Sequence, residues 1–226
     1  TEGGFTELSH ITKSLTIAWT TESLLNLIVL RLLSNQSLVD YYGVDADAVR
    51  SSYKAQEDLF YRLVPKKIDS GKNPDTFEWM VSRTTDGTRN PAPRELIHLL
   101  STVRKLQIQR FERGSADVEG AQLFERPPFK EALKEVSKVR YEQTLLAEYP
   151  TLREYLERLD GEKCEQTPQT LSKLWGVTED EALKLARRLS EVGFFTTVGD
   201  KASPSFWAAF LYRPALNLVQ GKAEAA

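Results

Sequence analysis

Apolar residues recur at helical spacing over most of the first two thirds of the chain. The run over 21–34 is apolar on nearly every side, which predicts a deeply buried helix capped by Thr20 or Thr21. Looser helical spacing continues to Pro65, residues 66–74 are a loop by their glycine and proline content, and a short helix is expected over 76–83. Pro93 fits the first turn of a longer helix. After a break at Pro127 and Pro128, helical stretches are expected over 129–146 and 152–159.

The last third changes character. A short helix ends at Gly176, and a second begins with Thr178 as N-cap and Glu181 three residues on, which is a capping box. Two β-like runs, 194–198 and 205–213, follow and are joined by a turn. Helix, turn, helix and two-stranded wing is the order of a winged helix-turn-helix. The pattern thus predicts a mainly α fold with a helical region over 1–126, connecting helices over 127–160, and a winged-helix domain with a C-terminal tail over 161–226.

The predicted wing carries many aromatic residues. Strand alternation places Phe206, Ala208 and Phe210 on one face. Trp207, Ala209 and Leu211 then lie on the other face. One face covers the core, and the other packs on the C-terminal segment or the helical region, or forms an apolar contact surface for a protein partner.

Composition narrows the class of protein. The 226 residues are 41% hydrophobic and 27% charged with a net charge of −2, which is ordinary for a globular domain and excludes a generally basic nucleic-acid-coating protein. The apolar run from Leu24 to Leu33 is too short to span a bilayer, so no membrane association is expected. A single cysteine, Cys164, excludes an internal disulfide and favours a reducing, cytoplasmic location. Its acidic neighbours suggest an exposed, unreactive thiol.

Catalytic and metal-binding signatures are missing from the sequence. There is no GxxxxGK[ST] loop, no GxGxxG and no GxSxG. His10 and His98 are far apart and have no metal-ligand spacing, and His98 fits a partly buried structural residue. We therefore expect no catalytic residue, metal or cofactor in this chain by itself.

Positive charge gathers between residues 81 and 113. Seven basic and three acidic residues there give +4, within a chain whose total is −2. Arg94 follows Pro93 at a predicted helix start, where a guanidinium and the helix dipole can both face a phosphate. The alternative is that Arg94 pairs with nearby carboxylates and the other basic residues form a solvated face.

The predicted second helix of the winged helix has a balanced charge. If it entered a DNA groove, its phosphate contacts would come from basic side chains nearby. The candidates are Lys173, Lys184, Arg187, Arg188 and, on the wing, Lys201. Four basic and four acidic residues between 167 and 193 cancel, and an acidic cluster opens the helix. Packing or protein contact therefore explains this region as well as DNA binding does.

Three segments resemble a known family. NPAPRELIHLLSTVRKLQ resembles the lid segment of P-loop ATPases of the STAND and origin-recognition branches of AAA+. LTIAWTTESLLNLIVLRLL is similar to the tract after the sensor-1 strand, with Leu24, Leu27, Ile28 and Arg31 in the matching places. FWAAFLYRPALNLVQGKA resembles the end of a bacterial group of these ATPases, where a winged helix follows the lid.

The resemblance implies a helical lid-like bundle and a nucleotide-sensing role. Arg94 matches sensor 2, which touches the γ-phosphate in those families, and Arg31 is a second nucleotide-sensing candidate. Walker A, Walker B and the sensor-1 strand are not in this sequence, so ATP and Mg²⁺ would be held by an N-terminal ATPase core outside it. A start at Thr1 rather than Met fits a fragment of a longer protein. The alternatives are a DNA-binding winged-helix regulator with a helical oligomerisation region, and a structural scaffold.

Overall fold

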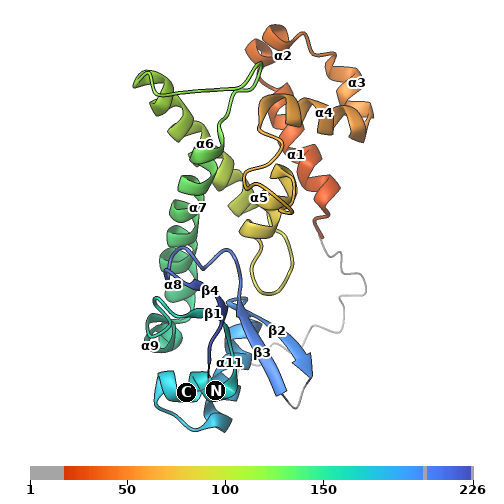
Figure 1. Ribbon diagram of the computed structural model, residues 1–226. Coiled ribbons are helices and arrows are strands. Elements are labelled where there is room, and N and C mark those ends of the chain that lie inside the picture. Colours follow the sequence, from red (N-terminus) through yellow and green to blue (C-terminus); the bar gives the residue numbers. More distant parts are fainter. Residues whose placement is uncertain (1–17, 201–202, 225–226) are drawn as a thin grey trace, which may run out of the picture.

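The chain folds into a helical part and a smaller part built on a sheet. The computed structural model describes residues 18–200 and 203–224. Within these residues the fold is mainly helical, with one four-stranded mixed sheet (Figure 1). The first helices are α1 (Thr21–Leu33), α2 (Gln36–Tyr42), α3 (Ala46–Ser51), α4 (Tyr53–Leu63) and α5 (Thr76–Thr84). This confirms the mainly α class.

Side-chain caps set the starts of the first helices. Thr20 accepts a hydrogen bond from the Ser23 amide, which confirms the predicted start of α1. The stretch with looser spacing resolves into three short helices, because Asn35, Asp45 and Ser52 each cap a new start. Residues 66–74 form the predicted loop.

Two long helices connect the ends of the molecule. α6 (Pro93–Glu112) packs along α7 (Arg126–Arg140), which runs toward the sheet (Figure 1). The break predicted at Pro127 and Pro128 is wrong, since both prolines lie in the first turn of α7, where a missing amide costs nothing. The proposed boundary after residue 126 therefore falls at the start of this helix. A π-helical turn (Tyr141–Leu145), α8 (Leu146–Glu148), a 3₁₀ turn (Pro150–Leu152) and α9 (Arg153–Glu157) follow.

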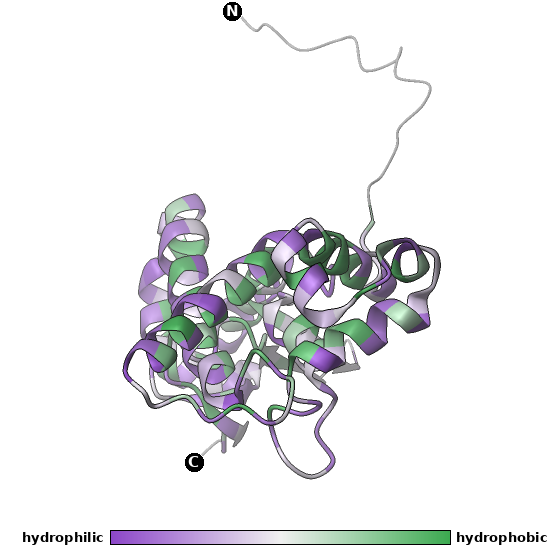
Figure 2. Ribbon diagram, turned by 90° about the horizontal axis from the view of Figure 1, so that it is seen from above, coloured by the Kyte–Doolittle hydropathy of each residue, from purple (hydrophilic) through white to green (hydrophobic). Residues whose placement is uncertain are grey.

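The core of the helical part lies between α1, α4, α5 and α6. Val29, Phe60, Met80 and Leu99 are almost completely buried there. Hydrophobic and hydrophilic residues alternate along the helices in Figure 2, as expected when a helix buries one face. No helix in the described ranges is long and apolar enough to cross a membrane.

The C-terminal part contains β1 (Lys163–Gln166), α10 (Pro168–Trp175), α11 (Glu179–Glu191), β2 (Phe195–Asp200), β3 (Ser203–Ala208) and β4 (Val219–Lys222). Gly176 ends α10 in the left-handed conformation, and Thr178 with Glu181 forms the predicted capping box of α11. The strands are ordered β2-β3-β1-β4, with β2–β3 and β3–β1 antiparallel and β1–β4 parallel. The two predicted strands pair as the β2–β3 hairpin. The prediction missed β1 and β4, two strands of four residues that extend this hairpin into a larger sheet.

Face alternation in the wing holds only as far as β3 extends. Phe206 and Ala208 are buried as predicted, and Trp207 is half-buried. After Ala208 the strand gives way to a turn, so Phe210 is exposed while Ala209 and Leu211 are buried. The prediction that Phe210 shares the buried face is wrong for this reason.

Candidate functional site

Arg94 is exposed in the first turn of α6. The helix begins after Ala92 with no side-chain cap, and Pro93 removes one of the amides that would otherwise need a partner. Among the described residues, Arg94 makes no hydrogen bond or ion pair, so the predicted alternative of a carboxylate partner does not occur there. It borders a hollow of about 110 Å³ together with His98, Arg140 and Thr144. An unpaired guanidinium beside free helix amides is an arrangement that attracts anions.

Glu95, the residue after Arg94, connects the start of α6 to the C-terminal part. Glu95 is only 6% exposed, and its carboxylate lies 3.2 Å from Arg140 Nη1. Arg140 also faces Asp86, at 3.7 Å, and the buried Tyr212. Burial raises the pKa of Tyr212 to about 12, so this phenol stays neutral. α6, α7 and the C-terminal part therefore share one polar cluster, in which Glu95 and Tyr212 are buried and Asp86 and Arg140 are half-buried.

A backbone contact joins the same two parts. The Gly87 amide donates to the Gly193 carbonyl at 2.6 Å, and the Thr196 hydroxyl donates to the Gly87 carbonyl at 3.3 Å. Gly193 sits in the left-handed region, with φ of 82°, where α11 gives way to β2. The loop between α5 and α6 is thereby held directly against the turn before β2.

Aromatic residues of the C-terminal part are covered largely by this chain itself. Phe194, Phe195 and Phe206 are buried. Phe210 is 39% exposed, but the Arg83 guanidinium lies 4.6 Å from its ring centroid and the Arg213 guanidinium 3.9 Å from it. Since Arg83 belongs to α5, packing against the helical region accounts for much of the aromatic surface.

Arg31 lines a different hollow from Arg94. This hollow, of about 200 Å³, lies between α1, α4 and α6, with Arg31 and Arg104 at its edge. Arg94 and Arg104 are ten residues apart on α6, or about 15 Å along the axis. The structure thus brings Arg31 together with Arg104 and not with Arg94.

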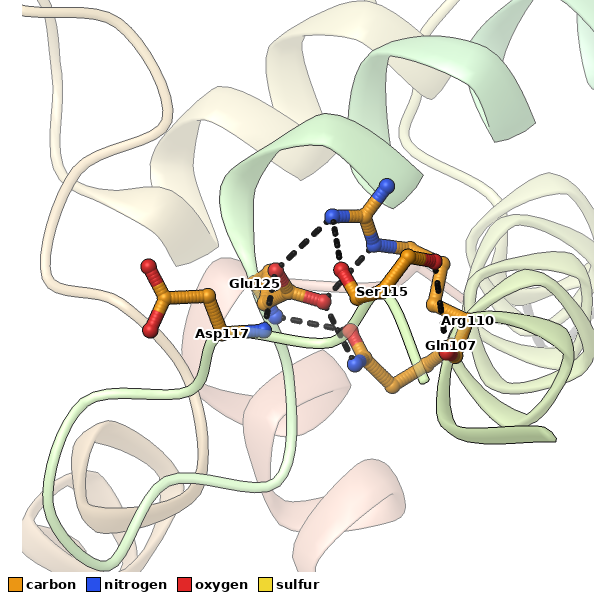
Figure 3. Close-up of polar contacts among 5 residues, drawn as sticks. All are labelled: Gln107, Arg110, Ser115, Asp117 and Glu125. Carbon is orange, nitrogen blue, oxygen red and sulfur yellow. Dashed lines mark hydrogen bonds and ion pairs between the residues drawn. The ribbon is translucent and has the colours of Figure 1, made fainter. Parts of the chain in front are cut away.

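A buried carboxylate fixes one wall of that hollow. Glu125 accepts hydrogen bonds from Arg110 Nε at 2.8 Å, from Gln107 Nε2 at 2.8 Å and from the Asp117 amide at 2.9 Å (Figure 3). These donors, Arg110 foremost, lower the pKa of Glu125 to about 2. Its neighbour Phe124 lines the hollow, and the Phe124 amide donates to the Leu63 carbonyl. The Glu125 cluster therefore closes the loop after α6 against α4.

The DNA-binding candidates lie on a surface of mixed charge. Lys184, Arg187 and Arg188 are exposed on α11, and Lys173 is exposed on α10. Acidic residues are exposed on the same helix: Glu179, Asp180, Glu181 and Glu191. Gln169 donates to Glu179, and Glu181 caps its own helix. Lys201 is outside the described residues. The arrangement leaves no uniformly basic face along the described length of α11.

Cys164 is buried, so the prediction of an exposed thiol is wrong. It lies in β1 with 1% of its surface exposed, because the unpredicted strand carries it into the sheet. Burial raises the pKa of the thiol, whereas the nearby Arg213 and Lys163 lower it. Burial, and not the predicted effect of acidic neighbours, is therefore the main influence on the pKa of Cys164.

The burial of Cys164 allows a direct test of whether β1 is packed into the sheet in solution. A thiol reagent at pH 7.5 should modify the native chain at least about tenfold more slowly than the urea-unfolded chain. Because Cys164 is the single cysteine, no other thiol contributes to the signal. Equal rates in the two states would show that β1 is open in solution.

His98 is half-buried and borders the hollow beside Arg94, whereas His10 is outside the described residues. Over 18–200 and 203–224, no three His, Cys, Asp or Glu side chains cluster in a way that could hold a metal ion. The chain matches no model of a known protein family, no curated protein and no solved structure.

Proposed function

We propose that this chain is the C-terminal regulatory region of a bacterial P-loop ATPase, with a nucleotide-sensing helical lid followed by a winged helix. The observation that carries the proposal is Arg94, exposed and unpaired at the uncapped start of a 20-residue helix. A phosphate held by a separate ATPase core would complete this position, since both the guanidinium and the helix dipole favour an anion.

Within the described residues, Arg94 would provide a single contact to a phosphate of ATP. They provide no cluster of carboxylates for Mg²⁺, so an N-terminal core would supply both the metal site and the phosphate loop. The role of this chain is then to sense the nucleotide. Arg31 is 63 positions from Arg94 in sequence and lines a separate hollow, so the proposal assigns the phosphate to Arg94 alone.

The C-terminal part suits transmission of the nucleotide signal. The order α10, turn, α11 and β2–β3 hairpin supports a winged helix, extended here by β1 and β4. The cluster of Glu95, Arg140, Asp86 and Tyr212 supports movement of the lid and winged helix together, because a displacement of α6 would take the buried Glu95 carboxylate away from Arg140. The mixed charge of α11 favours a protein contact over DNA for the exposed surface.

The test is ATP turnover by the full-length protein carrying Arg94→Ala. We expect kcat to fall at least about tenfold, because one charge-stabilising donor at the reacting phosphate is lost. Arg113→Ala, an exposed arginine at the other end of α6, is the matched control and should leave turnover unchanged. Wild-type turnover in Arg94→Ala would remove Arg94 from the mechanism.

A further inference from the structure

Two hollows with largely apolar linings lie side by side along α1. The first, of about 200 Å³, has a floor of buried Ile28, Phe60 and Leu63 and sides of half-buried Ile97 and Leu100. The second, of about 370 Å³, is lined by Trp19, Ser23, Asn26, Leu27 and Leu30. Arg31 borders both hollows. We name the two hollows together the α1–α6 groove.

The α1–α6 groove is positively charged at its edge. Arg31 and Arg104 line it, whereas no acidic residue lines either hollow. Both arginines are exposed, and neither has a hydrogen-bond or ion-pair partner in the part of the chain that the structure describes. Two unpaired guanidinium groups beside apolar surface match a ligand that carries carboxylates next to apolar side chains.

The shape of the groove favours a peptide over a drug-sized molecule. Ligand pockets commonly measure about 300–1,000 Å³ as one cavity, whereas here the space is split between hollows of about 200 and 370 Å³ that share Arg31. An amphipathic helix places anchors at i, i+3, i+4 and i+7, so successive anchors can enter neighbouring hollows. Leu30, 42% exposed at the second hollow, adds apolar surface for such a partner to cover.

We propose that the α1–α6 groove binds an acidic amphipathic helix of a partner protein. Apolar side chains of that helix fill the two hollows, and its carboxylates pair with Arg31 and Arg104. The Glu125 cluster preorganises the site, because it holds Phe124 as one wall. This inference is independent of the nucleotide-sensing proposal, since Arg94 borders a different hollow.

The experiment uses a synthetic amphipathic helix with leucine at i, i+4 and i+7 and glutamate at the flanking positions. Fluorescence anisotropy with the labelled peptide measures its affinity for the chain at low salt. A second peptide replaces every glutamate by lysine. We expect the glutamate peptide to bind at least about tenfold more tightly than the lysine peptide, because only carboxylates match the two arginines.

Charge reversal at the groove distinguishes this site from other surfaces. The double variant Arg31→Glu/Arg104→Glu should weaken binding of the glutamate peptide at least about tenfold and improve binding of the lysine peptide. Arg113→Glu, at the exposed C-cap of the helix that carries Arg104, is the control and should change neither affinity more than about twofold. Circular dichroism checks that each variant stays folded, as expected for exposed positions.

Three results of the peptide experiments would overturn the proposal. The first is that the glutamate peptide does not bind even at low salt. The second is that both peptides bind equally, and the third is that binding survives the double charge reversal. Sedimentation measures whether the chain associates with itself. Self-association that the double variant abolishes would assign the groove to a second copy of the chain and would contradict the proposal of an acidic partner helix.

Discussion

Gly87→Ala is expected to lower the free energy of unfolding by about 2–3 kcal/mol. A Cβ at this position would overlap the Phe195 carbonyl and would lie 2.9 Å from the Gly193 carbonyl oxygen. These obstacles are backbone atoms, so no rotamer change can relieve them, and the α5–α6 loop must separate from the turn before β2. Urea unfolding followed by tryptophan fluorescence measures the loss.

The control for Gly87→Ala is Asn90→Ala in the same loop. Asn90 is exposed, and its substitution should change the free energy of unfolding by less than about 0.5 kcal/mol. Hydrogen exchange of the Thr196 amide and its neighbours locates the effect, because those residues face Gly87. If Gly87→Ala has wild-type stability and wild-type exchange there, the contact between the two parts does not exist in solution.

Glu125→Ala is expected to lower the free energy of unfolding by about 3 kcal/mol, because it leaves Arg110 and Gln107 without their buried partner. The matched control is Glu119→Ala, an exposed glutamate in the same loop, which should be nearly neutral. Chemical unfolding at pH 7 measures both variants. Equal stability of the two variants would contradict a structural role for the Glu125 cluster.

The same carboxylate predicts how stability depends on pH. The pKa of Glu125 is lowered from 4.5 in the unfolded chain to about 2 in the folded chain. A lowered folded-state pKa stabilises the fold above the unfolded value, and this contribution is lost as the pH falls from about 4.5 toward 2. Wild-type stability should therefore fall more steeply than that of Glu125→Ala over this interval.

The sequence was informative where a local rule decides the structure. Thr20, Pro93, Gly176 and the Thr178–Glu181 capping box mark helix ends through contacts with residues close in sequence, and each lies where it was predicted. Local rules also explain the error at Pro127, because a proline that stops one element is equally suited to begin the next.

Features that depend on pairing between distant residues could not be predicted from the sequence. β1 and β4 are four residues each, and β1 forms only by pairing with β3 and β4, far along the chain. That pairing buries Cys164, which looked exposed between acidic neighbours. Likewise, the partnership of Arg140 with Glu95 and Asp86 spans tens of residues, and no local motif marks it.

Some candidate site residues could likewise be predicted from local sequence, whereas others depend on long-range packing. The place of Arg94 in the first turn of α6 could be predicted, because a proline and a helix start are visible in the sequence. Arg104 was visible only as one charge in a basic stretch. Its proximity to Arg31 depends on how α1 packs beside α6, so the groove needed the fold.

Nucleotide-dependent hydrogen exchange in the full-length protein tests most directly whether the lid and the C-terminal part respond together. We predict that a non-hydrolysable ATP analogue slows exchange both at the start of α6 and at residues 193–196, and that Arg94→Ala loses both responses. A change at α6 alone, or a response that persists in Arg94→Ala, would contradict nucleotide sensing through this arginine and its connection to the C-terminal part.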